Sequence, residues 1–207
     1  YLHYPNRLKH SLKSYNLKKT DPLHFMSKIF TLSGPSRSGK NTIAHKLLKN
    51  KSLNLSRAIT CTTREPRPGE KDSVDYYFLT NEEFDKLIEK DGFVEWANVH
   101  DYRYGTSTSE LEYQKKQNKN ILMVIDVKGA RSVKKKYPEA TTIFIQPSNI
   151  DELKTRMKKS NFSEHDMGVR LRTALSEMNA SDEFNHVVIN KEGHIKQAIQ
   201  KVVEIVQ

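Results

Sequence analysis

The sequence predicts an α/β fold: a parallel-sheet core with helices on both faces, a small inserted lobe and a helical lid. Two apolar runs, 121–125 and 141–145, are continuous instead of alternating, which is typical of parallel strands buried on both faces. Segments with apolar residues three and four apart separate these runs and predict helices. Between about 60 and 107 the strand–helix alternation breaks, which predicts the lobe. A polar stretch between two helices, about 157–169, predicts the lid.

The first predicted strand ends in a loop of the type that binds phosphate. Gly34, Gly39 and Lys40 fill the fixed positions of the pattern G-x-x-x-x-G-K. Glycines let backbone N–H groups turn toward phosphate oxygens, and the following helix adds the positive end of its dipole. The eighth position normally holds the Ser or Thr that binds Mg²⁺, but here it is Asn41, followed by Thr42. The loop therefore predicts a nucleotide site with a weak magnesium ligand.

Composition favours one polar globular domain over residues 26–207, with no place for a membrane span. Hydrophobic residues make up 36% and charged residues 29%, and no apolar run approaches the roughly 20 residues of a membrane helix. A single cysteine excludes an intrachain disulfide, so we expect a reducing, intracellular and cytoplasmic location. The net charge of +10 suits polyanionic ligands. Because no recognition helix, zinc spacing or aromatic RNA-binding signature is visible, we do not expect a nucleic-acid partner.

Residues 1–25 differ from the rest of the chain. They carry five basic residues against Asp21 alone and have no long apolar face. A disordered basic extension is the first interpretation, and an organellar targeting segment is the alternative.

The segment 60–70 holds two arginines on a loop stiffened by two prolines. Arg64 and Arg67 lie three residues apart, and guanidinium groups bind oxyanions bidentately, so the pair suits a phosphate clamp. The alternative is two solvated surface arginines. In the predicted strand 93–97, Glu95 either points to solvent or faces a pocket as an acceptor for the edge of a base.

Charged side chains also follow the later strands. Asp126 ends the run 121–125, and ligands of open α/β sheets gather at the carboxyl ends of strands, so it suits metal or substrate binding. We expect Ser148 to cap a helix that carries Arg156, and a further helix to carry Arg170. These two arginines flank the predicted lid.

The order and spacing of several motifs resemble those of guanylate kinases, from about Lys28 to the C-terminus. The motifs are Gly34-Pro-Ser-x-Ser-Gly-Lys40, Thr62-Thr-Arg-x-Pro-Arg-x-Gly-Glu70, Asp75-Tyr76, Phe93-x-Glu-Trp96, Tyr104-Gly105 and Ile125-Asp-Val-x-Gly-Ala130. The resemblance implies a core at 28–59 and 107–207, a GMP-binding lobe at about 60–106 and the lid. It also implies transfer of a phosphoryl group from ATP to GMP, and also to dGMP, with Mg²⁺, by a monomer or homodimer in purine nucleotide metabolism.

The resemblance also implies roles for individual residues. Those assigned to catalysis are Lys40, Arg64, Arg156, Arg170 and Asp126. Those assigned to ATP are Gly34, Pro35, Ser36, Arg37, Ser38, Gly39, Lys40, Asn41, Thr42 and Asn190. Those assigned to GMP are Thr60, Arg64, Arg67, Tyr76, Glu95, Tyr104, Thr106 and Asp126. Asn41 is the candidate for the metal.

Four positions depart from the family pattern. Arg37 replaces a usual glycine, so its backbone must adopt a negative φ or accept strain. Asn41 replaces the usual hydroxyl residue, Val124 stands where an acid is frequent, and Ser160 replaces a lid arginine. The alternative function is therefore a catalytically weak or inactive domain that binds GMP or a phosphopeptide.

Overall fold

The computed structural model describes residues 27–99, 101–159 and 164–207. The predicted extension 1–25, Ser160 and the centre of the predicted lid lie outside the described residues. The described chain divides into two compact units. One comprises 27–28 and Ser56–Ile121, and the other comprises Ile29–Leu55 and Leu122–Gln207.

The larger sheet has five strands in the order β2-β7-β1-β8-β9. They are β1 (Ile29–Ser33), β2 (Leu55–Arg57), β7 (Asn120–Val124), β8 (Thr141–Gln146) and β9 (His186–Ile189). β8 pairs in parallel with both β1 and β9. All five residues of β1 are buried, as expected for a parallel strand that is covered on both faces. The predicted parallel-sheet core is confirmed.

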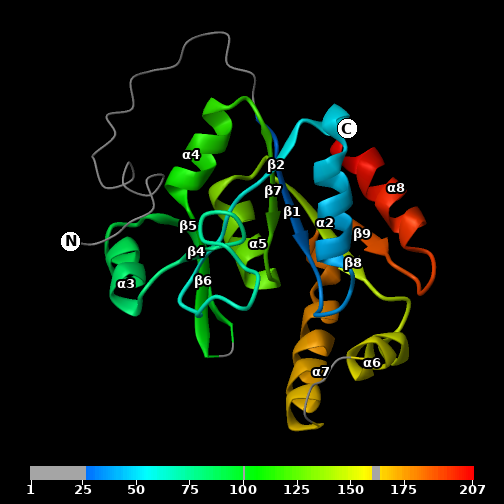
Figure 1. Ribbon diagram of the computed structural model, residues 1–207. Helices are drawn as coiled ribbons and strands as arrows, with labels where there is room; N and C mark the ends of the chain where they lie inside the picture. The colour runs from blue at the N-terminus through cyan, green and yellow to red at the C-terminus, as the bar shows by residue number, and fades with distance from the viewer. Residues whose placement is uncertain (1–26, 100, 160–163) are drawn as a thin grey trace. The chain divides into compact units, whose positions relative to one another are not determined.

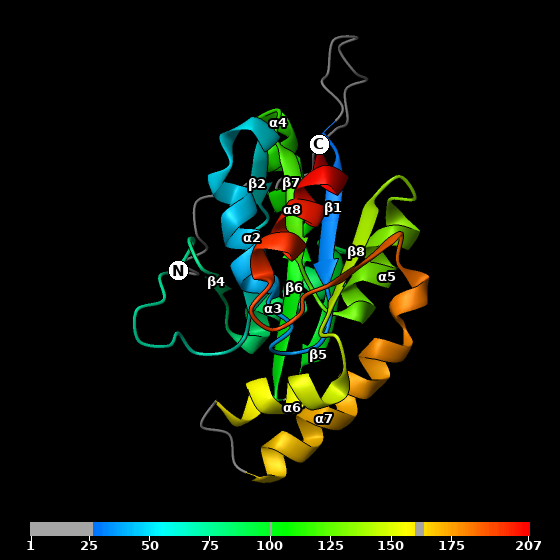
Figure 2. The ribbon, with the colours of Figure 1, turned by 90° about the vertical axis from the view of Figure 1, so that its right-hand side faces the viewer.

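Helices cover both faces of this sheet. The helices of this unit are α2 (Lys40–Lys49), α5 (Val127–Lys136), α6 (Ile150–Lys158), α7 (Glu164–Asn179) and α8 (Ile195–Val206), with short 3-10 turns η2 (Lys51–Leu53) and η3 (Ser181–Glu183). α2 and α8 lie side by side on one face, and α5 lies on the other (Figures 1 and 2). Because side chains alternate along a strand, Ile143 and Ile145 pack into the core under α2 and α8. Phe144 points the other way, onto Val127 of α5.

α6 and α7 lie side by side (Figure 2) and pack against each other through Leu153, Met157 and Ala174. The helix that carries Arg156 is not capped by Ser148, as predicted, but by its neighbour. Asn149 accepts a hydrogen bond from the backbone N–H of Glu152 at 2.8 Å. Ser148 and Asn149 are both residue types that cap helices, and in the structure Asn149 is the one that does so.

The smaller unit is built on a four-stranded sheet in the order β4-β3-β6-β5. Its elements are β3 (Cys61–Thr62), β4 (Tyr77–Phe78), α3 (Asn81–Glu89), β5 (Phe93–Val99), β6 (Tyr102–Ser107) and α4 (Thr108–Lys116). β6 is antiparallel to both β3 and β5. The unit has its own apolar core, which includes Tyr77, Phe84 and Leu87.

Residues 53–60 and the aromatic-rich residues 75–79 are each strand-like in sequence, but both strands are shorter in the structure. The strand expected over 53–60 is reduced to β2, because Asn54 adopts a left-handed backbone with φ of 49° at the end of η2. The strand expected over 75–79 is reduced to the two residues of β4. In both places polar turn residues use the backbone hydrogen bonds that a longer strand would need.

Thr80 with Glu83 and Ser107 with Glu110 have the sequence pattern of a capping box, which predicts a helix start at each, and the two differ in the structure. At α3, Thr80 accepts from the backbone N–H of Glu83, and the Glu83 carboxylate accepts from the backbone N–H of Thr80, as predicted. At α4, Ser107 caps the helix, but the Glu110 carboxylate does not return to it. It accepts instead from the hydroxyl of Tyr77 at 2.9 Å and from two further donors within the unit. The buried Glu110 carboxylate thus has three donors, two of which connect α4 to the rest of the unit, and it does not close the capping box.

We expect Thr80→Ala to lower the free energy of unfolding by about 1 kcal/mol, because it removes the side-chain acceptor at the start of α3. Thr80→Ser keeps the hydroxyl and should unfold like the unchanged protein. Chemical denaturation of the three proteins measures the difference. Equal stability of the alanine and unchanged proteins would contradict the importance of this cap.

Candidate functional site

The glycine-rich loop after β1 needs three residues with positive φ. These are Gly34 at 135°, Arg37 at 66° and Gly39 at 101°. Arg37 therefore adopts a left-handed backbone conformation. A glycine, usual at this position in the family, adopts that conformation without strain. Of the two possibilities that the sequence left open, Arg37 thus accepts the strain. The 3.1 Å hydrogen bond from the backbone N–H of Ser38 to the carbonyl of Pro35 closes this turn.

Close contacts also require glycine at two of these positions. A Cβ on Gly34 would lie 2.0 Å from the carbonyl oxygen of Ile145, in the neighbouring strand β8. A Cβ on Gly39 would lie 2.3 Å from the side-chain nitrogen of Asn190. That nitrogen donates a hydrogen bond to the carbonyl of Ser38 at 2.8 Å. Asn190 directly follows β9, so this bond connects the end of β9 to the loop. Its predicted role beside ATP stays a prediction.

The N-terminus of α2 is left open for a ligand. Gly39 is its N-cap, and no described side chain caps it or places an acid in its first turn. By contrast, side chains cap α3, α4, α5 and α6. Among the described residues, the hydroxyl of Ser38 and Oδ1 of Asn190 are buried without a hydrogen-bond partner. An open helix terminus beside an unused hydroxyl donor, here that of Ser38, is an arrangement that binds phosphate, whereas Oδ1 of Asn190 can only accept a hydrogen bond.

Lys40 is folded back onto this loop. Its Nζ donates to the carbonyl of Gly34 at 2.5 Å and to that of Pro35 at 2.8 Å. Burial lowers the pKa of Lys40 to about 8, although the carboxylates of Glu177 and Asp126 oppose this change. The lysine is thus charged at neutral pH but close to losing its proton.

Glu177, on α7, is the carboxylate that most affects Lys40, and the sequence did not single it out. Burial raises the pKa of Glu177 to about 7, with Lys40 opposing and Asp126 adding to the rise. Asp126 is the N-cap of α5, where its Oδ1 accepts from the backbone N–H of Gly129 at 2.7 Å. Its predicted role in metal or substrate binding is not excluded by this contact, which uses one of its two oxygens.

Arg156 and Arg170 occupy different environments in this unit. The Arg156 guanidinium bonds to Glu152, to Glu192 at 2.8 Å and to the carbonyl of Asn190 at 2.6 Å. In this arrangement the positive charge of Arg156, which was predicted to act on phosphate, is paired with two carboxylates of the chain. Arg170 lies seven residues before Glu177 on α7, so both side chains lie on one face of that helix.

Asn41 and Thr42 are exposed in the first turn of α2. The part of the chain that the structure describes contains no cluster of three His, Cys, Asp or Glu side chains able to hold a metal. No described helix is long and apolar enough to cross a membrane.

In the smaller unit, Arg64 is a buried arginine with every nitrogen engaged. Its side chain is 8% exposed. Nε donates to the hydroxyl of Tyr104 at 3.3 Å, Nη1 to the carbonyl of Glu65 at 2.6 Å, and Nη2 to both oxygens of Glu70 at 2.9 and 3.0 Å. The ring of Tyr76 lies 5.5 Å from the guanidinium carbon. The interpretation as a solvated surface arginine is wrong for Arg64, but it fits Arg67, whose side chain is exposed.

Glu95 faces inward and is 6% exposed, whereas its neighbour Trp96 is 42% exposed. Glu95 accepts a hydrogen bond from the hydroxyl of Thr106 at 2.7 Å. Phe93 pairs with Ser107 and Glu95 with Thr106, so β5 holds one extra residue there. This bulge re-aims the carboxylate. Thr60 is also buried in this unit.

The predicted site residues thus form two groups, one in each unit. The larger unit contains the loop 34–42, Asp126, Arg156, Arg170 and Asn190, and in it Asn190 contacts both the loop and Arg156. The smaller unit contains Thr60, Arg64, Arg67, Tyr76, Glu95, Tyr104 and Thr106, and in it Arg64 contacts Tyr76 and Tyr104 while Glu95 contacts Thr106. The sequence analysis did not single out the acids beside the cations, namely Glu70, Glu152, Glu177 and Glu192. The only sequence signals for them are the place of Glu70 at the end of the arginine motif and the seven-residue spacing of Glu177 from Arg170.

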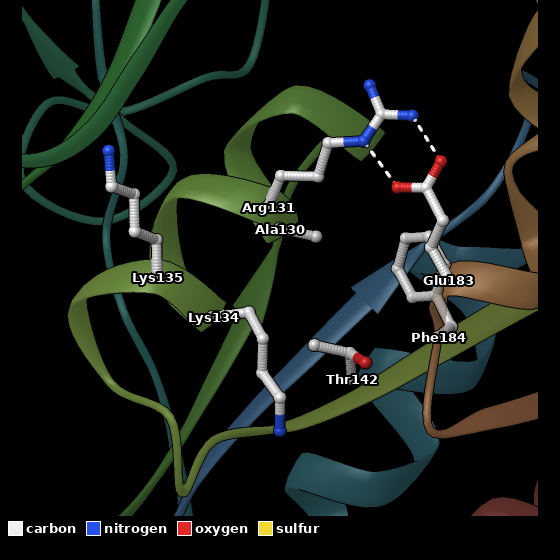
Figure 3. Close-up of a pocket in the computed structure, with 7 residues that line it drawn as sticks. All are labelled: Ala130, Arg131, Lys134, Lys135, Thr142, Glu183 and Phe184. Carbon is white, nitrogen blue, oxygen red and sulfur yellow. Dashed lines mark hydrogen bonds and ion pairs between the residues drawn. The ribbon is translucent and has the colours of Figure 1, made fainter.

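A separate shallow pocket of about 280 Å³ lies at the start of β8, over Ala130, Thr142 and Phe184. Figure 3 shows that it is rimmed by basic side chains of α5. Arg131 forms a two-point ion pair with Glu183, at 2.5 and 2.6 Å, and Lys134 donates to the carbonyl of Ala140. These charges are already partnered, and the amino end of a parallel strand is not where such sheets bind ligands. The pocket is not the candidate site.

Comparison with known proteins gives a consistent result. A model of the family described as guanylate kinase matches residues 26–207. The chain is 40% identical to guanylate kinases of Fusobacterium nucleatum and of Thermotoga maritima, over 86% of its length and 95% and 86% of theirs.

Among solved structures, the crystal structure of guanylate kinase from Anaplasma phagocytophilum aligns with a TM-score of 0.70 and 29% identity. It covers 87% of this chain and 84% of that one. The family match spans nearly all of the described residues and includes both groups of site residues. The chain therefore belongs to the guanylate kinase family.

Proposed function

We propose that this chain transfers a phosphoryl group from ATP to GMP, and also to dGMP, forming ADP and the nucleoside diphosphate. The observation that carries the proposal is the open phosphate-binding loop with Lys40 in one unit, together with a buried carboxylate, Glu95, and the arginine Arg64 in the other. Relatives at about 40% identity are described as guanylate kinases, which favours the enzyme over the alternative of an inactive binding domain.

Glu95 and Thr106 are the groups that select guanine. A carboxylate accepts hydrogen bonds from N1–H and from the 2-amino group of guanine, and adenine lacks both donors. Glu95 is buried and bonded to Thr106, so its position is fixed before the base arrives. A base that leaves this buried charge without its donors is rejected strongly. Arg64, Arg67, Tyr76 and Tyr104 then bind the phosphate of GMP.

Positioning and charge neutralisation account for most of the catalysis of phosphoryl transfer. Lys40 leaves the loop carbonyls for the phosphate oxygens of ATP, which open backbone N–H groups of α2 also bind. Arg156 and Arg170 add positive charge when released from their present contacts.

Magnesium fits this site only as a lightly held ion. Mg²⁺ keeps several waters and takes one or two protein oxygens together with substrate phosphates, so a cluster of three acids is not required. The exposed amide oxygen of Asn41 would hold it. When bound, the ion neutralises charge on the β- and γ-phosphate oxygens.

The proposal is tested by ADP release from ATP with Mg²⁺ and either GMP or AMP. We expect turnover with GMP and none with AMP. GMP binding without any turnover would support the inactive binding domain instead.

We expect Lys40→Ala to reduce GDP formation by at least about a hundredfold, because it removes a cation from the transferred phosphoryl group. GMP binding, measured by calorimetry, should stay close to that of the unchanged protein. Lys46→Ala, on the same helix but exposed, is the matched control and should keep full activity. Normal turnover by the Lys40 variant would rule out the proposed role of this loop.

A dependence on pH follows from the buried lysine. Lys40 must be protonated to bind phosphate, and its pKa is about 8, so kcat/KM for ATP should fall as pH rises through 8. Glu177 raises the pKa of Lys40, so Glu177→Gln should move this fall to lower pH. Asp182→Asn removes an exposed acid just beyond α7 and should leave the profile unchanged. An identical alkaline limb in the Glu177 variant would show that the carboxylate does not act on Lys40.

A further inference from the structure

The segment 64–70 is closed into a ring of contacts around Glu70. The Glu70 carboxylate accepts from Nη2 of Arg64 through both oxygens and from the backbone N–H of Arg67 at 2.8 Å. The backbone N–H of Glu70 donates to the carbonyl of Arg67 at 3.0 Å, across a turn in which Gly69 has a φ of 88°. One side chain thus joins the guanidinium of Arg64 to the backbone of Arg67.

The ring fixes Arg64 much more firmly than Arg67. Arg64 is buried, and its remaining hydrogen bonds go to the neutral oxygens of Glu65 and Tyr104, so Glu70 supplies the negative charge that a buried guanidinium requires. Burial acts to raise the pKa of Glu70, but hydrogen bonds from Arg67 and Arg64 outweigh it and hold that pKa below its usual range. The Arg67 side chain is exposed and makes no hydrogen bond to any described residue.

We propose that Glu70 is a positioning residue for the phosphate of GMP. It holds Arg64 and the 64–70 turn in the shape that receives the phosphate, and it acts through Arg64 without being a ligand itself. The inference rests on the proposed function, in which this unit binds GMP.

The geometry sets the direction of the effect. Hydrogen bonds between ionised groups are about twice as strong as neutral ones, and this carboxylate makes two of them to one nitrogen. Without it, Arg64 keeps only neutral acceptors and the turn loses a closing bond, so the phosphate must order both when it binds. Binding of the guanine base should be unaffected, because Glu95 and Thr106 lie on β5 and β6, outside the 64–70 turn.

The test uses Glu70→Gln, which keeps the size of the side chain and removes its charge. We expect KM for GMP to rise about tenfold or more, as for the loss of a charged hydrogen-bond partner, while kcat changes less than about threefold. In calorimetry, GMP should bind more weakly by the same factor, whereas guanosine, which lacks the phosphate, should bind as to the unchanged protein. Asp85→Asn is the matched control, since Asp85 pairs with Arg103 in the same unit, away from the 64–70 turn.

Three results would overturn the inference: unchanged GMP binding, tighter GMP binding, or an equal loss for GMP and guanosine. Tighter binding would mean that Glu70 competes with the phosphate, and an equal loss would mean that it supports the unit as a whole. If the glutamine variant does not fold, Glu70→Asp carries the test, because a shorter carboxylate cannot keep all three contacts; its KM should rise, and an unchanged KM would overturn the inference. If the unchanged protein itself fails to bind GMP, the proposed function is wrong, and this is distinguishable from an effect of Glu70.

Discussion

A cation that is to bind phosphate must stay charged and in place while no phosphate is present, and carboxylates of the chain meet this need. Arg64 forms an ion pair with Glu70, and Arg156 forms ion pairs with Glu152 and Glu192, whereas Glu177 and Asp126 act on Lys40 through their charge alone. Each cation is at least partly buried, where an uncompensated charge is costly. In the proposed function these acids therefore help to hold the binding groups in place, although only Asp126 among them was assigned a role from the sequence.

Lys40 shows the limit of this arrangement. Its two carboxylate neighbours only partly offset burial, so its pKa stays near 8, and its Nζ rests on two backbone carbonyls. Both carbonyls belong to the loop whose N–H groups bind phosphate in the proposed function. A lysine held on neutral acceptors can exchange them for charged oxygens with a net gain, because charge-assisted hydrogen bonds are the stronger ones. A direct ion pair at this position would have held the lysine too tightly for that exchange.

The parts of the fold that could be predicted depend on local sequence. The continuous apolar runs predict β7 and β8, Thr80 and Glu83 predict the start of α3, and the glycine spacing predicts the loop. The parts that could not be predicted depend on partners far along the chain. Glu110 leaves its capping box because Tyr77 and Ile59 reach it, and Asn190 supports the loop from 152 positions beyond Ser38. Of the acids beside the cations, Glu177 and Glu192 were missed for the same reason. Glu70 and Glu152 lie only six and four residues from their arginines, but a charged residue at such a position is equally typical of a solvent-exposed surface.

In the proposed function, the choice of guanine over adenine depends on strand register as much as on residue type. In β5, one extra residue between Phe93 and Glu95 sets the carboxylate opposite Thr106; without it, Glu95 would face Gly105, which has no side chain to donate. The same shift sets Trp96 opposite Gly105, where a Cβ would lie 2.8 Å from the Cβ of the tryptophan. Glycine at 105 is thus required by the bulge, and the bulge is required by the Glu95–Thr106 bond. Because slipping a strand by one residue turns every side chain to the other face, any change that removed the bulge would cost the site its carboxylate even with Glu95 still in the sequence.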